Sequence, residues 1–209
     1  MKSLAILLVV LVTVSVLSAP SSAGSFEASL GHTDPAWQVS LHYHPSAPPE
    51  GASPAAGGFW ARHVSGYFTF LWSKDVDYPD GRDYTGILDS TGFPGDEQTG
   101  DFDIFDSSFG GGLEFWISRP HPYERDSATL LSAGVILGFS IVNRSDWNEF
   151  YDPMHILDPS GHYKVLEDES REYGLEVGAA VALSPVVLRG TYDTVLGTRV
   201  SLGYVFNWG

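Results

Sequence analysis

Six charged side chains stand out because they occur inside alternating, largely apolar segments, where a charge is costly unless it is paired. They are Glu27, Glu114, Glu176, Arg189, Asp193 and Arg199. All six fall on the face opposite to the large apolar side chains. Opposite charges confined together favour ion pairs and charge-assisted hydrogen bonds. The sequence therefore predicts an internal polar network that fills and stabilises an interior rather than conducting ions, made of Glu114, Glu176, Arg189, Asp193 and Arg199.

Two acidic clusters could bind a hard cation through oxygen ligands. The segment Asp75–Gly81 resembles a calcium loop, but its third Asp comes one position late. The second cluster runs from Asp101 to Asp106. Ca²⁺ and Mg²⁺ are therefore candidate ligands, although a solvated acidic loop is the favoured interpretation. No metal site is assigned and no cofactor is expected.

Histidine and serine could supply other chemistry. His42 and His44 share a strand face, but a zinc site needs three or four convergent ligands, and the sequence has neither Cys nor an HExxH motif. A His–Ser pair, His42 or His63 with Ser40 or Ser65, could hydrolyse lipid as some membrane barrels do. Small inward serines are also expected as filler, and GxSxG, GxGxxG and P-loop motifs are absent. We therefore expect no enzyme activity, with a membrane-embedded lipid hydrolase as an alternative.

The elements that position these residues are β-strands. Residues 171–209 show the pattern most clearly, because apolar and small or polar side chains alternate with a period of two. The same pattern predicts eight strands, at residues 26–31, 36–43, 59–73, 109–118 and 130–142 and three more within 171–209. The second face of these strands is rich in Gly, Ala and Ser rather than in the Lys, Glu and Thr of a water-facing sheet. Small residues suit the crowded interior of an eight-stranded barrel.

The apolar face is expected to contact lipid. Aromatic residues stand at its ends, as in interfacial girdles: Trp37, Tyr43, Trp60, Trp72, Tyr204 and Trp208. The predicted fold is all-β, an eight-stranded antiparallel up-and-down transmembrane β-barrel with outer-membrane lipid as a partner. The longest connections, residues 74–106 and 143–170, are the third and fifth, so both fall on the outer side if the last strand ends in the periplasm.

The N-terminal segment has the features of a secretory signal. Lys2 precedes an uncharged apolar run, Leu4–Leu17, and Ser22–Ala23 offers a cleavage site. We expect a signal peptide at 1–23 and a barrel domain at 24–209. The chain has no Cys, so disulfides cannot stabilise it.

The charge distribution limits the partners. The formal net charge is −15, with 26 acids and 11 bases, which argues against nucleic-acid binding. Candidate partners of the two acidic loops are divalent cations and extracellular ligands, and we expect a monomer. Aromatic and apolar loop residues could mediate adhesion or cover the barrel mouth as a lid: Trp147, Phe150, Tyr151, His155, Ile156 and Tyr163.

The inward charges also suggest a register for the last hairpin. A three-residue turn at 195–197 would place Asp193 opposite Arg199 and Gly203 opposite Arg189, because the paired residues must face the same way. Gly197 would supply the positive φ of such a turn.

The preceding hairpin is expected to turn at 185–186. This register would place Ala182 opposite Arg189. Two small neighbours, Ala182 and Gly203, would then leave room for the Arg189 guanidinium.

The chain resembles small bacterial outer-membrane barrels of the OmpA/OmpX/OmpW type, in the porin-like superfamily. The resemblance is carried by the signal segment, the alternating strands and the aromatic last strand Val200–Trp208, although Gly209 follows where such proteins usually end on an aromatic residue. It implies a bacterial outer-membrane location. The lumen would be narrow or plugged and the role structural or a surface interaction, with a narrow channel for small solutes as an alternative.

Overall fold

The computed structural model describes residues 24–33, 36–45, 63–73, 79–117, 131–183 and 185–206. Among these residues no helix is long and apolar enough to cross a membrane. The expected signal peptide lies outside the described residues, as do Trp60 and Trp208 of the predicted girdle. The strands are β1 (Gly24–Thr33), β2 (Ala36–Pro45), β3 (Val64–Ser73), β4 (Arg82–Asp83), β5 (Glu97–Trp116), β6 (Leu131–Tyr151), β7 (His162–Leu183), β8 (Val186–Asp193) and β9 (Gly197–Phe206).

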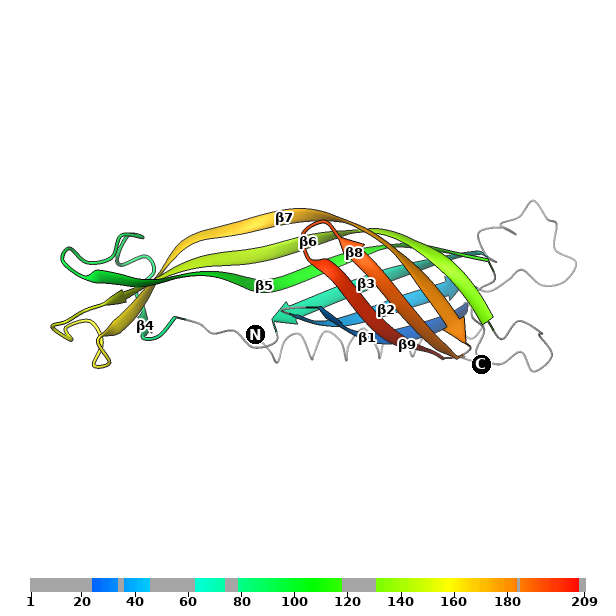
Figure 1. Cartoon of the computed structure of the whole chain (residues 1–209), viewed down its shortest axis with the longest axis horizontal. Coiled ribbons are helices and arrows are strands. Elements are labelled where there is room, and N and C mark those ends of the chain that lie inside the picture. Colours follow the sequence, from blue (N-terminus) through cyan, green and yellow to red (C-terminus); the bar gives the residue numbers. More distant parts are fainter. Residues whose placement is uncertain are drawn as a thin grey trace, which may run out of the picture.

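Eight of these strands close into a barrel (Figure 1). Neighbours along the chain pair antiparallel, and β1 pairs with β9 to join the two ends of the sheet. The predicted eight-stranded antiparallel up-and-down barrel is therefore confirmed. The remaining strand, β4, was not predicted; it has two residues and lies parallel to β7.

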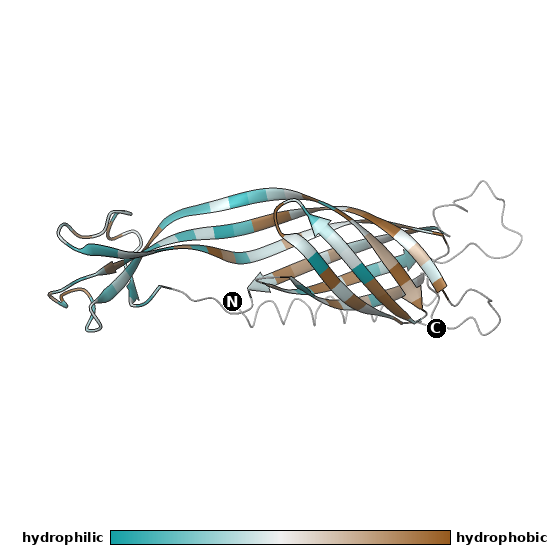
Figure 2. Ribbon diagram, in the orientation of Figure 1, coloured by the Kyte–Doolittle hydropathy of each residue, from teal (hydrophilic) through white to brown (hydrophobic). Residues whose placement is uncertain are grey.

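The two faces of the barrel wall differ as the alternation predicts. Large apolar side chains point outward; Leu30 is 68% exposed and Leu175 is 70% exposed. The inward positions of the barrel strands carry small or polar side chains, among them the buried Ser29 of β1 and Ser140 of β6. Figure 2 shows apolar residues concentrated on the barrel, whereas the part beyond it is mainly hydrophilic.

Three strands continue far beyond the barrel. β5, β6 and β7 have 20, 21 and 22 residues, whereas the other barrel strands have eight to ten. Pairing between β3 and β5 ends at Trp72 and Ser107, and pairing between β7 and β8 begins at Glu176 and Asp193. We call the three-stranded part beyond these points, residues 97–106, 143–151 and 162–171, the stalk.

The stalk corrects the prediction that residues 74–106 and 143–170 are loops. Much of both segments is strand, with cross-strand pairs that extend to Glu97, Tyr151 and His162. The alternation signal is weak there because the buried apolar positions, such as Ile104, Phe150 and Val165, are scattered among charged and polar residues and do not form one uniformly apolar face. Asp, Glu and Asn also have low β-propensity, which makes such strands read as loops.

A small folded unit, here called the head, stands at the end of the stalk; it comprises residues 79–96 and 152–161 (Figure 1). Its core is shared with the end of the stalk: Phe150, Tyr163 and Val165 of the stalk are packed against Tyr84, Leu88 and Leu157 of the head. Of the two alternatives for the aromatic loop residues, a lid over the barrel mouth is therefore wrong for Phe150 and Tyr163, which pack at the opposite end of the stalk.

The registers of the last two hairpins differ from the prediction by two residues. Arg189 pairs with Ser201 and with Ala180, and Gly197 pairs with Asp193. The last turn lies at 194–196 because the Asp193 carboxylate accepts hydrogen bonds from the backbone N–H groups of Val195 and Leu196, at 2.9 and 3.0 Å.

In the preceding hairpin, Leu183 pairs with Val186. A shift of two residues keeps every side chain on its own face. The inward set is therefore unchanged although its neighbours differ. Gly197 does have a positive φ, of 74°, as the predicted turn requires.

Candidate functional site

The interior of the barrel holds a cluster of buried charges around Arg189. Its guanidinium forms a bidentate pair with Glu27, with Nη2 at 2.7 Å from Oε2, and its Nε donates to Glu114 Oε1 at 2.7 Å. Arg189 is 3% exposed, and both glutamates are fully buried. The arginine from β8 thus bridges β1 and β5 across the lumen.

Two histidines complete this cluster. His42 Nδ1 lies 3.0 Å from Glu114 Oε1, and His44 Nε2 lies 3.3 Å from Glu27 Oε2. Glu27 is one of the six inward charges of the sequence, but the predicted network does not include it. The network does not include His42 or His44 either. The alternation in β1 and β2 predicts that Glu27, His42 and His44 face inward. The pairing of β1 with β9 then brings them to Arg189.

A second cluster surrounds Arg199. Its Nη2 lies 2.7 Å from Glu176 Oε2 and 3.7 Å from Asp193 Oδ2. Tyr67 connects the two clusters, because its hydroxyl donates to Glu176 at 2.8 Å and its ring stacks on that of His42, with centroids 5.5 Å apart. The five residues of the predicted network therefore lie in two groups, with Tyr67 between them.

Glycine makes this arrangement possible at two inward positions. A Cβ at Gly138 would lie 2.0 Å from the Tyr67 hydroxyl, so any larger residue would displace the tyrosine. A Cβ at Gly203 would overlap the Glu27 carboxylate. Gly203 was expected to make room for Arg189, but the shifted register gives that space to Glu27.

Apolar clusters lie toward both ends of the lumen. The inward side chains of β8 show the order of the apolar and charged layers along the barrel. Val187, near the start of β8, belongs to a cluster with Trp116 and Ile136. Arg189 and Asp193 follow, and beyond them Leu196 packs in the second cluster, with four further buried residues: Ala36, Leu71, Phe105 and Val142. The charged groups along β8 thus lie between two apolar layers.

The contacts that the structure shows for the candidate histidines differ from the His–Ser pairs of the alternative lipid hydrolase. His42 lies 3.3 Å from Ser29 rather than beside Ser40, and His44 Nδ1 lies 2.6 Å from Ser65. His63 instead contacts the carbonyl oxygen of Trp116. The order Ser65–His44–Glu27 matches the order of groups in a hydrolytic triad.

The setting of this triad differs from that of a hydrolase. Glu27 is held in a bidentate pair with Arg189, and Ser65 is fully buried. A nucleophilic serine must reach a substrate carbonyl, whereas Ser65 is closed off from solvent. The arrangement is that of a buried polar cluster rather than of an accessible nucleophile.

The described residues contain no group of three or more His, Asp or Glu side chains that could hold a metal ion. Asp75 and Asp77 of the calcium-like segment lie outside the described residues. The second acidic cluster, Asp101–Asp106, forms part of strand β5 rather than a ligand loop.

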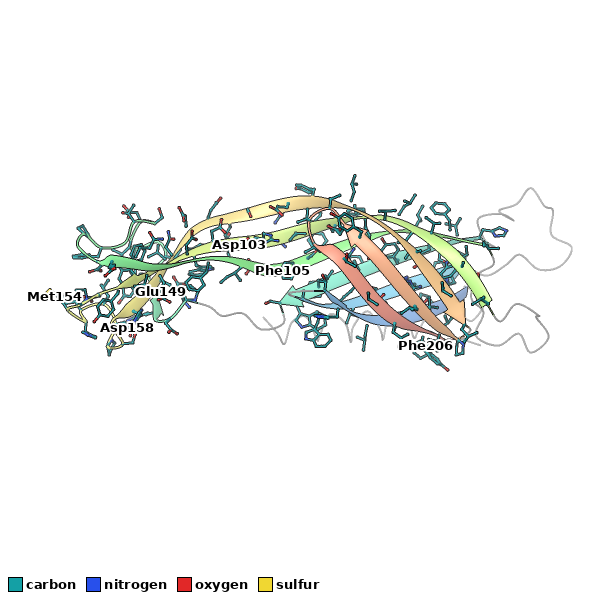
Figure 3. The ribbon with its side chains drawn as sticks, viewed as in Figure 1. Asp103, Phe105, Glu149, Met154, Asp158 and Phe206 are labelled. Carbon is teal, nitrogen blue, oxygen red and sulfur yellow. The ribbon has the colours of Figure 1, made fainter. Side chains whose placement is uncertain are left out.

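The stalk and head form the main solvent-facing surface beyond the barrel. Residues 79–106 and 143–171 contain 15 carboxylates and four basic side chains. In Figure 3, Asp103 and Phe105 mark the stalk near the barrel, Met154 and Asp158 mark the head, and Phe206 lies at the other end of the molecule. Among the described residues outside the barrel, four large apolar side chains are more than half exposed, all on the head: Ile87, Phe93, Met154 and Ile156.

The head presents its loops in a fixed conformation. The Asp152 carboxylate accepts hydrogen bonds from the backbone N–H groups of Met154, Ile156 and Leu157. Tyr163 is fully buried; its hydroxyl donates to Asp96 at 2.9 Å and accepts from the N–H of Phe93 at 2.8 Å. Burial is the main factor that raises the pKa of Tyr163 to about 12. The phenol is therefore neutral at physiological pH and can donate.

The edges of the stalk are irregular and charged. On β5 the register shifts between Gln98 and Gly100 and again between Phe105 and Ser107; β7 carries an extra residue near Glu167. Bulges and charges are devices that prevent a sheet edge from pairing with another strand.

No protein-family model matches the sequence, and no curated protein is significantly similar to it. Two solved structures of Ail, the attachment invasion locus protein of Yersinia pestis, align with 87% of this chain and 94% of Ail. One is 14% identical; the other, in complex with the heparin analogue sucrose octasulfate, is 13% identical; both have a TM-score of 0.35. The class of this protein is defined by the chain's own geometry: it is an eight-stranded barrel with an apolar outer surface and an acidic extension.

Proposed function

We propose that this protein is a non-enzymatic bacterial outer-membrane barrel that presents its stalk and head at the cell surface to contact cationic partners. Three features support a membrane location: the closed barrel, its exposed apolar outer face and the small, buried residues inside. An exposed apolar band of this extent would otherwise cause aggregation in water. Within the described part of the chain, the long strands extend from one end of the barrel, as outer loops do in such proteins.

The observation that carries the surface role is the stalk ending in a folded head. A structureless loop needs no buried tyrosine, aromatic stacking or satisfied carboxylates, whereas a binding element benefits from preorganisation. The excess of carboxylates over basic groups makes a cationic partner electrostatically complementary, and charge of this kind accelerates association. The same surface should repel polyanions.

Membrane insertion is tested by electrophoresis in detergent. A folded membrane barrel should migrate differently from the boiled sample, because its strands resist unfolding until heated. Identical migration before and after boiling would contradict the barrel in a membrane. This measurement involves no partner, so it tests location separately from surface binding.

Surface binding is tested with defined polyions and the full protein in phosphatidylcholine nanodiscs. We expect poly-lysine to bind and 0.5 M NaCl to abolish the binding, since screening weakens exposed charge interactions. Heparin should not bind. A variant with Asn in place of Asp101, Asp103, Asp146 and Asp168 should bind poly-lysine at least several-fold more weakly. Empty nanodiscs are the control, and heparin binding would contradict the proposal.

We further propose that the lumen is closed. The ion pairs that cross it, Arg189 with Glu27 and Glu114, and the apolar layers toward both ends support this. Planar-bilayer recordings of the purified protein should therefore show no conductance steps. Reproducible single-channel steps would favour the alternative, a narrow channel for small solutes.

A further inference from the structure

Three aspartates lie directly opposite one another on the three strands of the stalk. Asp103 of β5 pairs with Asp146 of β6, and Asp146 pairs with Asp168 of β7. Like charges opposite one another on neighbouring strands destabilise a sheet. The stalk thus holds three carboxylates in one row. Among the described residues, its three strands pair only with one another at this level, because the pairing with β3 and with β8 ends before it.

The charged groups around Asp146 add to the repulsion. Asp101 and Asp103 face it from β5, and Glu167 and Asp168 face it from β7. On its own strand the neighbouring Arg144 is already engaged, because its Nη1 lies 2.7 Å from Asp103 and its Nε lies 3.6 Å from Glu172. One arginine thus serves a face with several carboxylates.

We propose that the aspartate row Asp103–Asp146–Asp168 makes the stalk a pH-sensitive joint, loosened by carboxylate repulsion at neutral pH and stiffened when a proton enters the row in mild acid. The joint would set how rigidly the head is held above the barrel. The proposal requires no partner and is independent of the surface interaction proposed above.

The pKa shifts of the stalk aspartates have the direction that the proposed joint requires. Burial, together with the charges of Asp103 and Asp168, raises the pKa of Asp146, and burial likewise raises that of Asp106. A raised pKa in the folded state means that the folded stalk holds its protons more tightly than the unfolded chain. This contribution to stability is fully present below the ordinary carboxyl pKa and is lost as the pH rises through the raised value.

The head titrates in the opposite direction. Backbone N–H groups, that of Leu157 foremost, lower the pKa of Asp152, and the Ser160 hydroxyl lowers that of Asp158. These carboxylates stabilise the head above the ordinary Asp pKa of about 3.9 and cease to do so in stronger acid. Between roughly pH 4.5 and 6 the stalk should therefore stiffen while the head stays intact.

Hydrogen exchange of the full-length protein in nanodiscs, followed by mass spectrometry at pH 5 and pH 8, tests the joint. Peptides from barrel strand 108–116 provide the reference for the intrinsic effect of pH. Relative to that reference, we expect peptides covering 143–151 and 162–171 to be about fivefold better protected at pH 5. Equal relative protection at the two pH values would overturn the proposal.

The Asp146→Asn variant tests the cause. It should raise the protection of the stalk from exchange at pH 8 toward the value at pH 5, which removes most of the pH dependence. The second variant, Asp168→Asn, should act in the same direction. The Asp89→Asn variant removes one negative charge from the head and should retain the full pH dependence of the stalk. Flattening by Asp89→Asn would assign the effect to net charge, and a full pH dependence in both row variants would overturn the proposal.

Discussion

Replacing Arg189 by Leu is expected to destabilise the barrel by about 3–5 kcal/mol, the typical cost of removing one partner from a buried ion pair. The variant leaves the Glu27 and Glu114 carboxylates buried inside the barrel without their cation. Neither glutamate can turn to solvent, because both are fully buried. The measurement is the temperature at which the folded band is lost in unboiled gels, which should fall by about 10 °C for a chain of this size.

The matched control removes the charge of the two glutamates as well. In a triple variant, Arg189→Leu with Glu27→Gln and Glu114→Gln, no carboxylate is left unpaired. Most of the lost stability should return, because replacing a whole buried ion-pair group costs far less than breaking it. An unchanged transition temperature in Arg189→Leu alone would show that the cluster does not support the barrel.

Replacing Tyr163 by Ala is expected to unfold the head while the barrel stays intact. Tyr163 is fully buried, stacks on Phe150 with ring centroids 5.3 Å apart, and holds Phe93 and Asp96 by its hydroxyl. Removing a large buried aromatic side chain costs about 3–5 kcal/mol. The core of the head is small, so a loss of this size should exceed the free energy that keeps the head folded.

The readouts for this variant separate the two parts of the molecule. Proteolysis within 79–96 and 152–161 should become rapid, whereas the gel shift of the barrel should not change. Tyr163→Phe keeps the stacking and loses only the two hydrogen bonds, so it should give an intermediate rate of cleavage. Resistance of Tyr163→Ala equal to that of the unmodified chain would show that the head is not held by this core.

The sequence predicts the barrel well because one physical rule governs its wall. Lipid outside and a crowded interior require alternating large apolar and small or polar residues, and this period of two is visible without coordinates. The inward position of Arg189, Arg199, Glu114 and Glu176 follows from the same parity. Register errors of two residues do not disturb it, so the lumenal set could be identified although both predicted hairpin pairings were wrong.

The sequence does not reveal the stalk for a related reason. Asp101 and Asp103 alternate with Phe102 and Ile104, but acidic residues are frequent in the stalk strands and bulges interrupt their alternation, so neither face is uniformly apolar. Its strands are specified by pairing across β5, β6 and β7 and by their continuity with the barrel wall. The head core cannot be read from the sequence either, because Tyr84 comes from a segment far along the chain from the directly paired Phe150 and Tyr163.

By itself, therefore, the sequence determined which residues face inward and that the chain forms a barrel, because alternation is a local property. The tertiary structure decided which charges meet. It placed Glu27 on Arg189 through the contact of β1 with β9, and it aligned Asp103, Asp146 and Asp168 in one row of the stalk. These pairings depend on register and on strand closure, and such long-range relations are not recorded in the local order of residues.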